Sequence, residues 1–457
     1  MSKDFSLKKF KIDQLRLNAS KADLIEVGKK QAKEIPVDQL GIYKPVDRDV
    51  VQMIKTQEDT MIPELLPLRH KRMMENAFSF LRGTAGVMEY DLLNGIQSKI
   101  MVMICGDAHL NNFGFFASPE RQLLFGLNDF DETKVDNWES DLKRLLVSAK
   151  LIGEINGYKA DHLRDILKKA ADSYASGIKD AENLKLLDRF YESYDINNFF
   201  DFAREDKQMI KILKKIAEKA PQNNSDKVVK KFTVSKDDQL IFKENPPRAR
   251  RISEQTYQEL TNAIVEYKQK LTLEMQLLLS NFRMTDIIRY SVGVGSFGTR
   301  CYLVLLTGKD NSHLVLQVKE AMPSKYDLNT LSVAQAKLQG YEEGQRVIAG
   351  QRILQTFYDP FLGYTEACGR SYYVRQFRDM KDSIDTAKLD EESFTAYTTL
   401  CAFILARAHY QSPTAPIIYG YLEESKKFSK YMADWAIEYS KQVHQDYDDF
   451  QKYLGGE

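Results

Sequence analysis

The segment CGDAHLNNFGFF, residues 105–116, places a carboxylate, an imidazole and two amides directly behind an apolar stretch. The preceding residues 98–104, SKIMVMI, have the composition of a buried strand. Asp107 and Asn112 are five positions apart, and Asp129 follows another short strand-like stretch. Phosphoryl transfer needs one acid to orient the attacking hydroxyl, and an amide and a carboxylate to hold magnesium, so this set suits that reaction. Turn carboxylates and caps are the structural alternative.

A glycine-rich turn is the second candidate feature. Gly293, Gly295 and Gly298 lie in VGVGSFGTR, and Ser296 belongs to the same turn. Dinucleotide-binding folds place a helix after such glycines, whereas RCYLVLL predicts a strand here. Glycines in a turn between two strands let backbone amides approach phosphates closely, so we expect a hairpin that covers phosphates. A bulged structural hairpin is an equally good interpretation of this motif alone.

Lys319 ends the apolar stretch LVLQVKEA, the second strand-like stretch after Gly298. A partly desolvated lysine needs an acidic or phosphate partner. Its place after a glycine turn resembles the third-strand lysine of protein kinases, which contacts the α- and β-phosphates of ATP. Glu342 and Glu343, in the predicted helix 332–355, are the candidates to orient it. The alternative is an edge-strand lysine whose ammonium reaches solvent.

The short motifs around these residues resemble those of aminoglycoside phosphotransferases and related small-molecule kinases. GDAHLNN is similar to their G-D-x-H-x-x-N, and NDFDE to their metal-binding segment. The resemblance implies that Asp107 is the catalytic base and that Asn112 and Asp129 bind magnesium. Asp131 is then a second-metal or network carboxylate, and His109 shapes the loop.

Two supporting residues complete the predicted site. Asp141, in WESDLKRL, resembles the acid at a helix start that braces the catalytic loop in those kinases. Arg82, in FLRG, has no counterpart in them. It is a candidate for contact with phosphate or substrate, and pairing with a buried acid is at least as good an interpretation.

The order of these motifs along the chain is rotated. In ordinary kinases the glycine loop and lysine precede the catalytic Asp, but here both follow Asp107. Circular permutation explains this order at little energetic cost when the original termini lie close together at the surface. It predicts that the helix at 392–410 follows the small lobe and that the chain then ends nearby.

Several longer motifs resemble the bacterial DUF2252 family across about residues 70–412. They are FSFLRG, CGDAHLNNFGFFASPERQLLFGLNDFDET, WESDLKRL, VGVGSFGTRCYLVLL, LQVKEA, GQRVIAGQR, YYVRQFRDMK and LARAHYQS. This resemblance implies a kinase-like fold without naming a substrate.

The hydrophobic periodicity predicts an α+β chain. The resemblance of its motifs implies a two-lobed, protein-kinase-like fold, circularly permuted and with extra helices. Strands are expected at 98–104 and 122–128 and in the region from 286 to 377, and one of the expected helices covers residues 256–279. Residues 220–250 are expected to form a loop with a small hairpin or a flexible insertion. Residues 1–60 form a helical or loosely packed lead-in and residues 61–285 the large lobe. Residues 286–385 form the small lobe, and residues 386–457 complete the large lobe.

Composition argues against several classes of protein and of binding site. The 457 residues include 65 basic and 65 acidic side chains, so no general basic surface for nucleic acid or membrane is expected. The four cysteines form no CxxC pair, which argues against zinc sites and disulfides. No secretion signal and no apolar run long enough to cross a membrane is visible, so a cytoplasmic protein is expected.

The sequence therefore predicts an ATP- and Mg²⁺-dependent phosphotransferase whose acceptor is a small-molecule hydroxyl or amine. A catalytically silent nucleotide-binding protein is the alternative, because the same residues would bind without turnover. A metal-dependent phosphoesterase also uses G-D-x-H, but it needs further histidine motifs that the six histidines here do not form.

Overall fold

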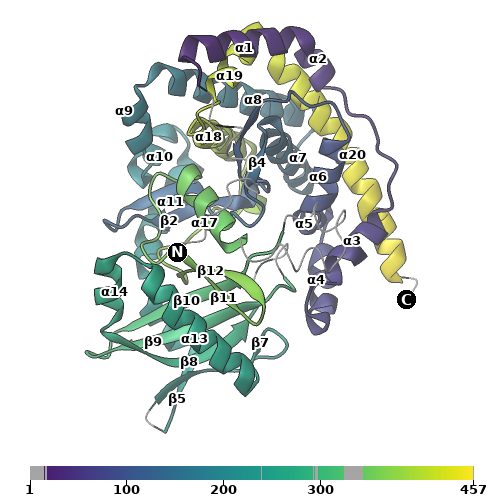
Figure 1. Ribbon diagram of the computed structural model, residues 1–457. Helices are drawn as coiled ribbons and strands as arrows, with labels where there is room; N and C mark the ends of the chain where they lie inside the picture. The colour runs from purple at the N-terminus through teal and green to yellow at the C-terminus, as the bar shows by residue number, and fades with distance from the viewer. Residues whose placement is uncertain are drawn as a thin grey trace.

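The computed structural model describes residues 15, 18–237, 239–291, 293, 297–323 and 343–455. It is mixed α/β, with helices above a six-stranded antiparallel sheet in Figure 1. We call residues 18–222 and 386–455 the helical part, and residues 225–376 the sheet part. The chain leaves the helical part, builds the sheet and then returns to pack its last helices on the first ones. Among the described residues, no helix combines the length and apolar character needed to span a membrane.

The helical part is organised around buried α7, α8 and α18. The long α8 packs against both α18 and α20, so segments from before and after the sheet part share one core. The helices of this part are α1 (Lys21–Glu34), α2 (Val37–Leu40), α3 (Val50–Glu58), α4 (Leu66–Met73), α5 (Ala77–Gly83), α6 (Ala85–Leu93), α7 (Glu139–Ile155), α8 (Ala160–Asn183), α9 (Leu186–Tyr191), α10 (Ile196–Phe202), α11 (Lys207–Lys219), α18 (Glu391–His409), α19 (Pro416–Glu424) and α20 (Phe428–Gly455).

Two short strand pairs lie inside the helical part and carry the acidic motifs. β1 (Met101–Ile104) pairs antiparallel with β4 (Lys134–Asn137), and β2 (Phe113–Ala117) pairs with β3 (Leu123–Leu127). The predicted strands at 98–104 and 122–128 are confirmed as β1 and β3. β2 and β4 lack a periodic pattern because they are short and almost wholly buried, so their side chains do not alternate between core and solvent.

The sheet part has strand order β11-β12-β10-β9-β8-β7. Lys319 on β10 lies opposite Cys301 of β9 and Tyr373 of β12. The strands are β7 (Ala249–Arg250), β8 (Phe282–Tyr290), β9 (Cys301–Gly308), β10 (His313–Glu320), β11 (Gly363–Ala367) and β12 (Arg370–Gln376), with a separate hairpin of β5 (Thr233–Lys236) and β6 (Gln239–Phe242). The helices of this part are α12 (Ser225–Phe232), α13 (Glu254–Lys270), α14 (Leu273–Leu279) and α17 (Glu343–Leu354).

Residues 256–279 differ in two ways from what the sequence predicts. The segment expected as one helix from 256 to 279 is divided into α13 and α14, and α13 packs on the sheet instead of on the helical part. Its buried residues Leu260, Ile264 and Tyr267 share a core with Val304 and Leu316, because an exposed apolar sheet face has to be covered.

In the N-terminal region, expected to be helical or loosely packed, the described residues form α1, α2 and α3. Helix α1 packs closely on α19 at the top of Figure 1. A side chain at Gly28 would collide with the carbonyl of Ile417, and one at Gly420 with the carbonyl of Ile25. The two glycines thus allow this close approach of the helices. The predicted helix 332–355 is described only from residue 343, and its earlier part lies outside the described residues.

Candidate functional site

Residue Asp141, at the start of α7, holds the loop after β1, residues 105–112, through hydrogen bonds. The two carboxylate oxygens of Asp141 accept hydrogen bonds from the backbone N–H groups of Cys105, at 2.7 Å, and Gly106, at 2.8 Å. His409 Nε2 donates to the same carboxylate at 3.1 Å, and the Tyr174 hydroxyl donates to His409 Nδ1 at 2.8 Å. All three side chains of this network are buried, so Asp141 holds the backbone of the loop in one position.

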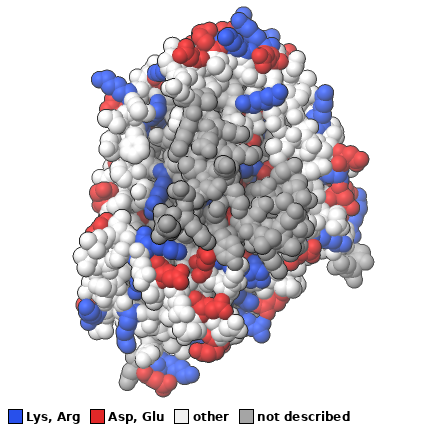
Figure 2. Space-filling view, viewed as in Figure 1, with Lys and Arg blue, Asp and Glu red and all other residues white. Residues whose placement is uncertain are grey.

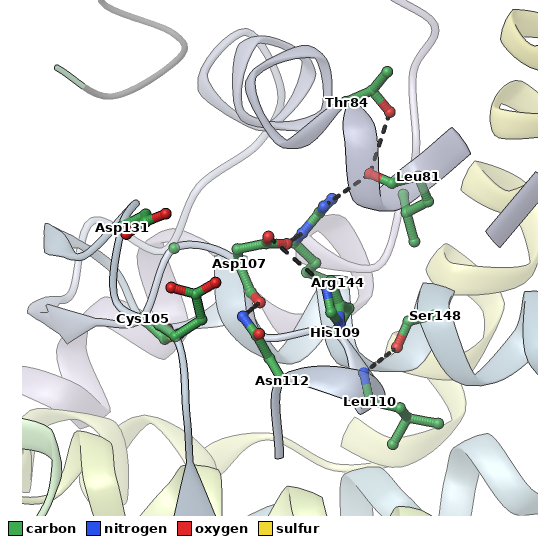
Figure 3. A network of polar contacts seen from close by, with 12 residues as sticks. Leu81, Thr84, Cys105, Asp107, His109, Leu110, Asn112, Asp131, Arg144 and Ser148 are labelled. Atoms are coloured by element: carbon green, nitrogen blue, oxygen red, sulfur yellow. Dashed lines mark hydrogen bonds and ion pairs between the residues drawn. The ribbon is translucent and has the colours of Figure 1, made fainter. Parts of the chain in front are cut away.

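Asp107 lies at the edge of this loop, with one carboxylate oxygen bound by Arg144 (Figure 3). Arg144 also donates to the carbonyl of Leu81 at 2.9 Å, which ties Asp107 to the end of α5. The backbone carbonyl of Asp107 accepts from the Asn112 amide at 2.6 Å. The Asp107 side chain is 16% exposed and that of Arg144 3%, so the carboxylate reaches solvent and the arginine does not.

His109 is buried against the ring edge of Phe78, with Nε2 3.8 Å from Asp107 Oδ2. Burial lowers its pKa well below the usual value, and the positive charges of Arg82 and Arg144 lower it further. The imidazole is therefore neutral near pH 7 and fills the loop interior without adding charge.

Lys319 of the sheet part meets the acids of the helical part. Its ammonium forms an ion pair with Asp131 and lies 3.9 Å from Asp129 Oδ1. The Tyr373 hydroxyl donates to the other oxygen of Asp131 at 2.9 Å. Lys319 is 4% exposed, whereas Asp129 is 37% exposed and faces the solvent side of the cluster. The cluster joins the end of β10 to the loop after β3.

The charges in this cluster oppose the effect of burial on the pKa values of Asp129 and Lys319. Burial raises the pKa of Asp129, but Lys319, Arg375 and Lys381 lower it to about 2. The pKa of Asp131 is raised by burial and by the neighbouring charge of Asp129. Burial would lower the pKa of Lys319, yet the two carboxylates hold it well above its usual value. Lys319 therefore stays charged and Asp129 stays ionised over the physiological pH range.

The loop of Asp107 and the loop of Asp129 are in direct contact. The thiol of Cys105 donates to the carbonyl of Asp129 at 3.1 Å. The backbone N–H of Asn128 donates to the carbonyl of Asn112 at 2.8 Å. Gly106 has φ of 80° and lies against the backbone of Glu132, where a side chain would collide with the carbonyl oxygen. The two acidic motifs therefore form one continuous surface.

The donors suit a magnesium ion bound together with phosphate. Asp129 Oδ1 is buried and has no hydrogen-bond partner among the described residues, and the Asn112 amide donates through Nδ2, which leaves Oδ1 available. Within the described residues, no three His, Cys, Asp or Glu side chains converge as metal ligands. Magnesium commonly binds one or two carboxylates and completes its octahedron with phosphates and water, so this small donor set fits it.

The remaining predicted residues are distributed as follows. Gly293 and Gly298 have positive φ, of 90° and 113°, and flank the turn after β8. Gly295, Ser296 and Glu342 lie outside the described residues. Glu343 forms an ion pair with Arg346, one turn along α17. The ion pairs of Lys319 in the described part of the chain go to Asp129 and Asp131 instead.

Arg346 is a site residue that the sequence did not reveal. Its guanidinium donates to the carbonyls of Asp131 at 2.8 Å, Thr133 at 2.6 Å and Met322 at 2.8 Å. It thus fixes the backbone of the acidic loop to the sheet part. It lies in the quoted motif GQRVIAGQR, but that motif does not reveal its contacts, because an arginine in a helix is usually interpreted as surface-exposed.

Arg144 and His409 were also missed, although both lie in quoted motifs. Arg144 is three positions after Asp141, so one helix face presents both toward the loop. His409 lies in LARAHYQS, far from Asp141 along the chain. Lys381 follows β12 and is a further half-buried cation near Asp129. Their partners become visible only after folding.

Comparison with known proteins places the chain in one family. No curated protein and no solved structure matches it. The model of the DUF2252 family, described as an uncharacterized protein conserved in bacteria, matches residues 61–453. This match contains β1 to β4, the whole sheet part and α18 to α19, and therefore every residue of the site described above. The chain belongs to the DUF2252 family.

Proposed function

We propose that this protein is an ATP- and Mg²⁺-dependent phosphotransferase with a kinase-like fold in circularly permuted order. The observation that carries the proposal is the contact of Lys319 with Asp131 and Asp129. The lysine motif and the acidic motif lie far apart in the chain, and each was identified separately as a phosphate or magnesium element. A chance resemblance gives no reason for the two motifs to meet.

The order of the elements supports the same proposal. Lys319 lies on the third strand, β10, of the run that begins with β8 and continues through the glycine turn to β9. Protein kinases carry their phosphate-binding lysine on the third strand of a run whose first two strands flank the glycine loop. Here α18, which follows the sheet part, packs on α8 of the helical part, as a permuted chain would require.

The residues have separable roles in this proposal. Gly293 and Gly298 let the turn lie over the phosphates, and Lys319 neutralises the α- and β-phosphates. Asn112 and Asp129 would hold a magnesium ion, and its charge would offset that of the phosphates. The free oxygen of Asp107 orients an acceptor hydroxyl or amine and accepts its proton. Catalysis then rests on positioning and electrostatic stabilisation.

One observation favours a second candidate, a nucleotide-binding protein without turnover. Asp107 is ion-paired with Arg144, and a carboxylate held in such a pair has a structural role even when no substrate is present. The two candidates share the nucleotide site and differ only in the use of Asp107.

The test is Mg²⁺-dependent ATP binding by calorimetry on the wild type, Lys319→Met and Asp129→Asn. We expect both substitutions to abolish measurable binding, because each removes one charge that contacts phosphate or metal. Lys309→Met, on the exposed turn after β9, is the matched control and should bind like the wild type. ATP binding that survives both substitutions would refute the proposal, provided that circular dichroism shows folded variants.

A second measurement separates the two candidates. ATP hydrolysis or phosphoryl transfer that is lost in Asp107→Asn, while ATP binding is retained, supports the phosphotransferase. ATP binding without any turnover in the wild type supports the silent nucleotide-binding protein.

A further inference from the structure

Two arginines contact the glycine turn and a third lies on the neighbouring helix α5; within the described residues none of the three pairs with a carboxylate. Arg72 comes from α4, Arg82 from α5 and Arg248 from the turn before β7. In the described part of the chain none of them forms an ion pair, in contrast to Arg48, Arg144 or Arg346. Clustered guanidinium groups repel one another, so an arrangement without counter-charges is unfavourable unless an anion joins it.

Arg72 and Arg248 hold the first part of the turn through neutral backbone acceptors. Arg72 donates to the carbonyl of Gly293, and its guanidinium lies 4.3 Å from the ring centre of Phe297. Arg248 Nε donates to the carbonyl of Ser291 at 3.2 Å. Burial lowers the pKa of Arg72, and the nearby charge of Arg248 lowers it further. These contacts fix the two side chains, and no carboxylate of the described ranges pairs with either of them.

Arg82 extends the cluster toward Asp107. Its Nε is buried and has no hydrogen-bond partner within the described ranges. Its guanidinium lies 5.9 Å from the ring centre of Phe78, the ring that contacts His109. Burial lowers the pKa of Arg82, and Arg72 adds to this, although Asp107 and Asp129 oppose it. Arg82 is therefore a half-buried cation whose buried Nε has no partner among the described residues.

The acids near Arg82 either lie beside other cations or form no ion pair with Arg82 within the described residues. Asp107 pairs with Arg144, and Asp129 lies beside Lys319. Glu75 is exposed and within electrostatic range of Arg72 and Arg82, but in the part of the chain that the structure describes it forms no ion pair with either. The local charge therefore remains positive at the side of the site where Asp107 faces solvent.

We infer that Arg72, Arg82 and Arg248 form a binding site for a phosphate group beside Asp107. Guanidinium groups bind phosphate through short, paired hydrogen bonds, and Arg82 has an unused donor for them. The phosphate has two possible sources, an anionic acceptor molecule or the terminal phosphoryl group of the nucleotide. The inference rests on the contacts of Arg72 and Arg248 with the turn and on the unpartnered Nε of Arg82. If the proposed function holds, an acceptor source means that the substrates are phosphorylated small molecules.

The experiment measures binding of inorganic phosphate to the full-length protein by calorimetry, alone and with saturating Mg²⁺ and a non-hydrolysable ATP analogue. We expect phosphate to bind the free protein, and Arg82→Gln to weaken binding by about 10-fold or more, the loss expected for a hydrogen bond to a charged group. Arg72→Gln, which replaces the less buried arginine on α4, should weaken phosphate binding by a similar factor. Arg164→Gln, an exposed α8 arginine paired with Asp434, is the control and should bind like the wild type.

The outcomes distinguish the two sources of the phosphate group and test the inference itself. Phosphate binding that persists with the ATP analogue assigns the site to the acceptor, and binding that the analogue displaces assigns it to the terminal phosphoryl group. Undetectable phosphate binding by folded wild-type protein would overturn the inference, as would binding that Arg82→Gln and Arg72→Gln leave unchanged. Because ATP binding is measured separately on the Lys319 and Asp129 variants, failure of this inference is distinguishable from failure of the proposed function.

Discussion

Asp141→Asn tests whether one buried carboxylate supports the loop that carries Asp107. In the wild type the two oxygens of Asp141 accept backbone hydrogen bonds at 2.7 and 2.8 Å and a third from His409 at 3.1 Å. Asparagine keeps one acceptor and places an NH₂ group opposite a backbone N–H or the histidine. The substitution therefore removes at least one charge-assisted bond and leaves a buried donor unpaired.

The expected loss in the free energy of unfolding follows from these contacts. A hydrogen bond to a charged group contributes about 1.5–3 kcal/mol, and an unpaired buried donor costs about 1–3 kcal/mol. We therefore expect the free energy of unfolding to fall by about 3–5 kcal/mol. At about 2 °C per kcal/mol, the value for larger domains, the melting temperature should fall by about 6–10 °C.

The assay is differential scanning calorimetry, with hydrogen exchange at the amides of Cys105 and Gly106 as a local probe. Asp172→Asn, on an exposed position of α8, is the matched control and should change stability by less than about 0.5 kcal/mol. An Asp141→Asn protein that melts with the control and keeps slow exchange at both amides would refute the idea that this carboxylate holds the loop.

Three further predictions concern single residues. Gly106→Ala should destabilise the protein by about 1–3 kcal/mol, because a positive φ and the carbonyl of Glu132 exclude a side chain, and chemical denaturation measures this loss. Burial and the charge of Arg375 lower the pKa of Lys381 to about 7 from 10.5, although Asp129 opposes them. The unfolded chain then binds more protons between those values, so stability should rise as pH increases from about 7 to 10.5, and a Lys381→Met protein melted across that range should lose this rise. Arg346→Lys should leave two carbonyls of the acidic loop without donors and lower the melting temperature by at least about 2 °C, whereas an unchanged value would show that water replaces the guanidinium.

The charge pattern of the surface agrees with the composition. Figure 2 shows Lys and Arg interspersed with Asp and Glu on one face, as the balanced 65 and 65 residues predict. Within the described residues, Arg72, Arg82 and Arg248 form no ion pair, and composition cannot locate such a cluster. A balanced total is compatible with a local excess whenever folding brings residues of one sign together.

Local pattern determined many of the individual elements. The periodicity of WESDLKRLLVSAKLIG predicts α7, and the apolar run before Lys319 predicts β10, because a helix or strand must bury one repeating set of side chains. Residue type and spacing also identified the family and singled out Asp107, Asp129 and Lys319 as candidates. These signals each lie within one element or its adjoining turn, a range over which backbone geometry dictates which side chains share a face.

Only the tertiary structure decided which of these residues meet. Lys319 contacts Asp131 and lies beside Asp129, while Glu343 turns to Arg346, because the position of α17 depends on the packing of β11 and β12 beneath it. His409 reaches Asp141 because α18 returns to the helical part after the whole sheet has formed. Contacts between distant parts of the chain depend on how complete elements pack, and hydrophobic burial drives that packing without leaving a local trace in the sequence.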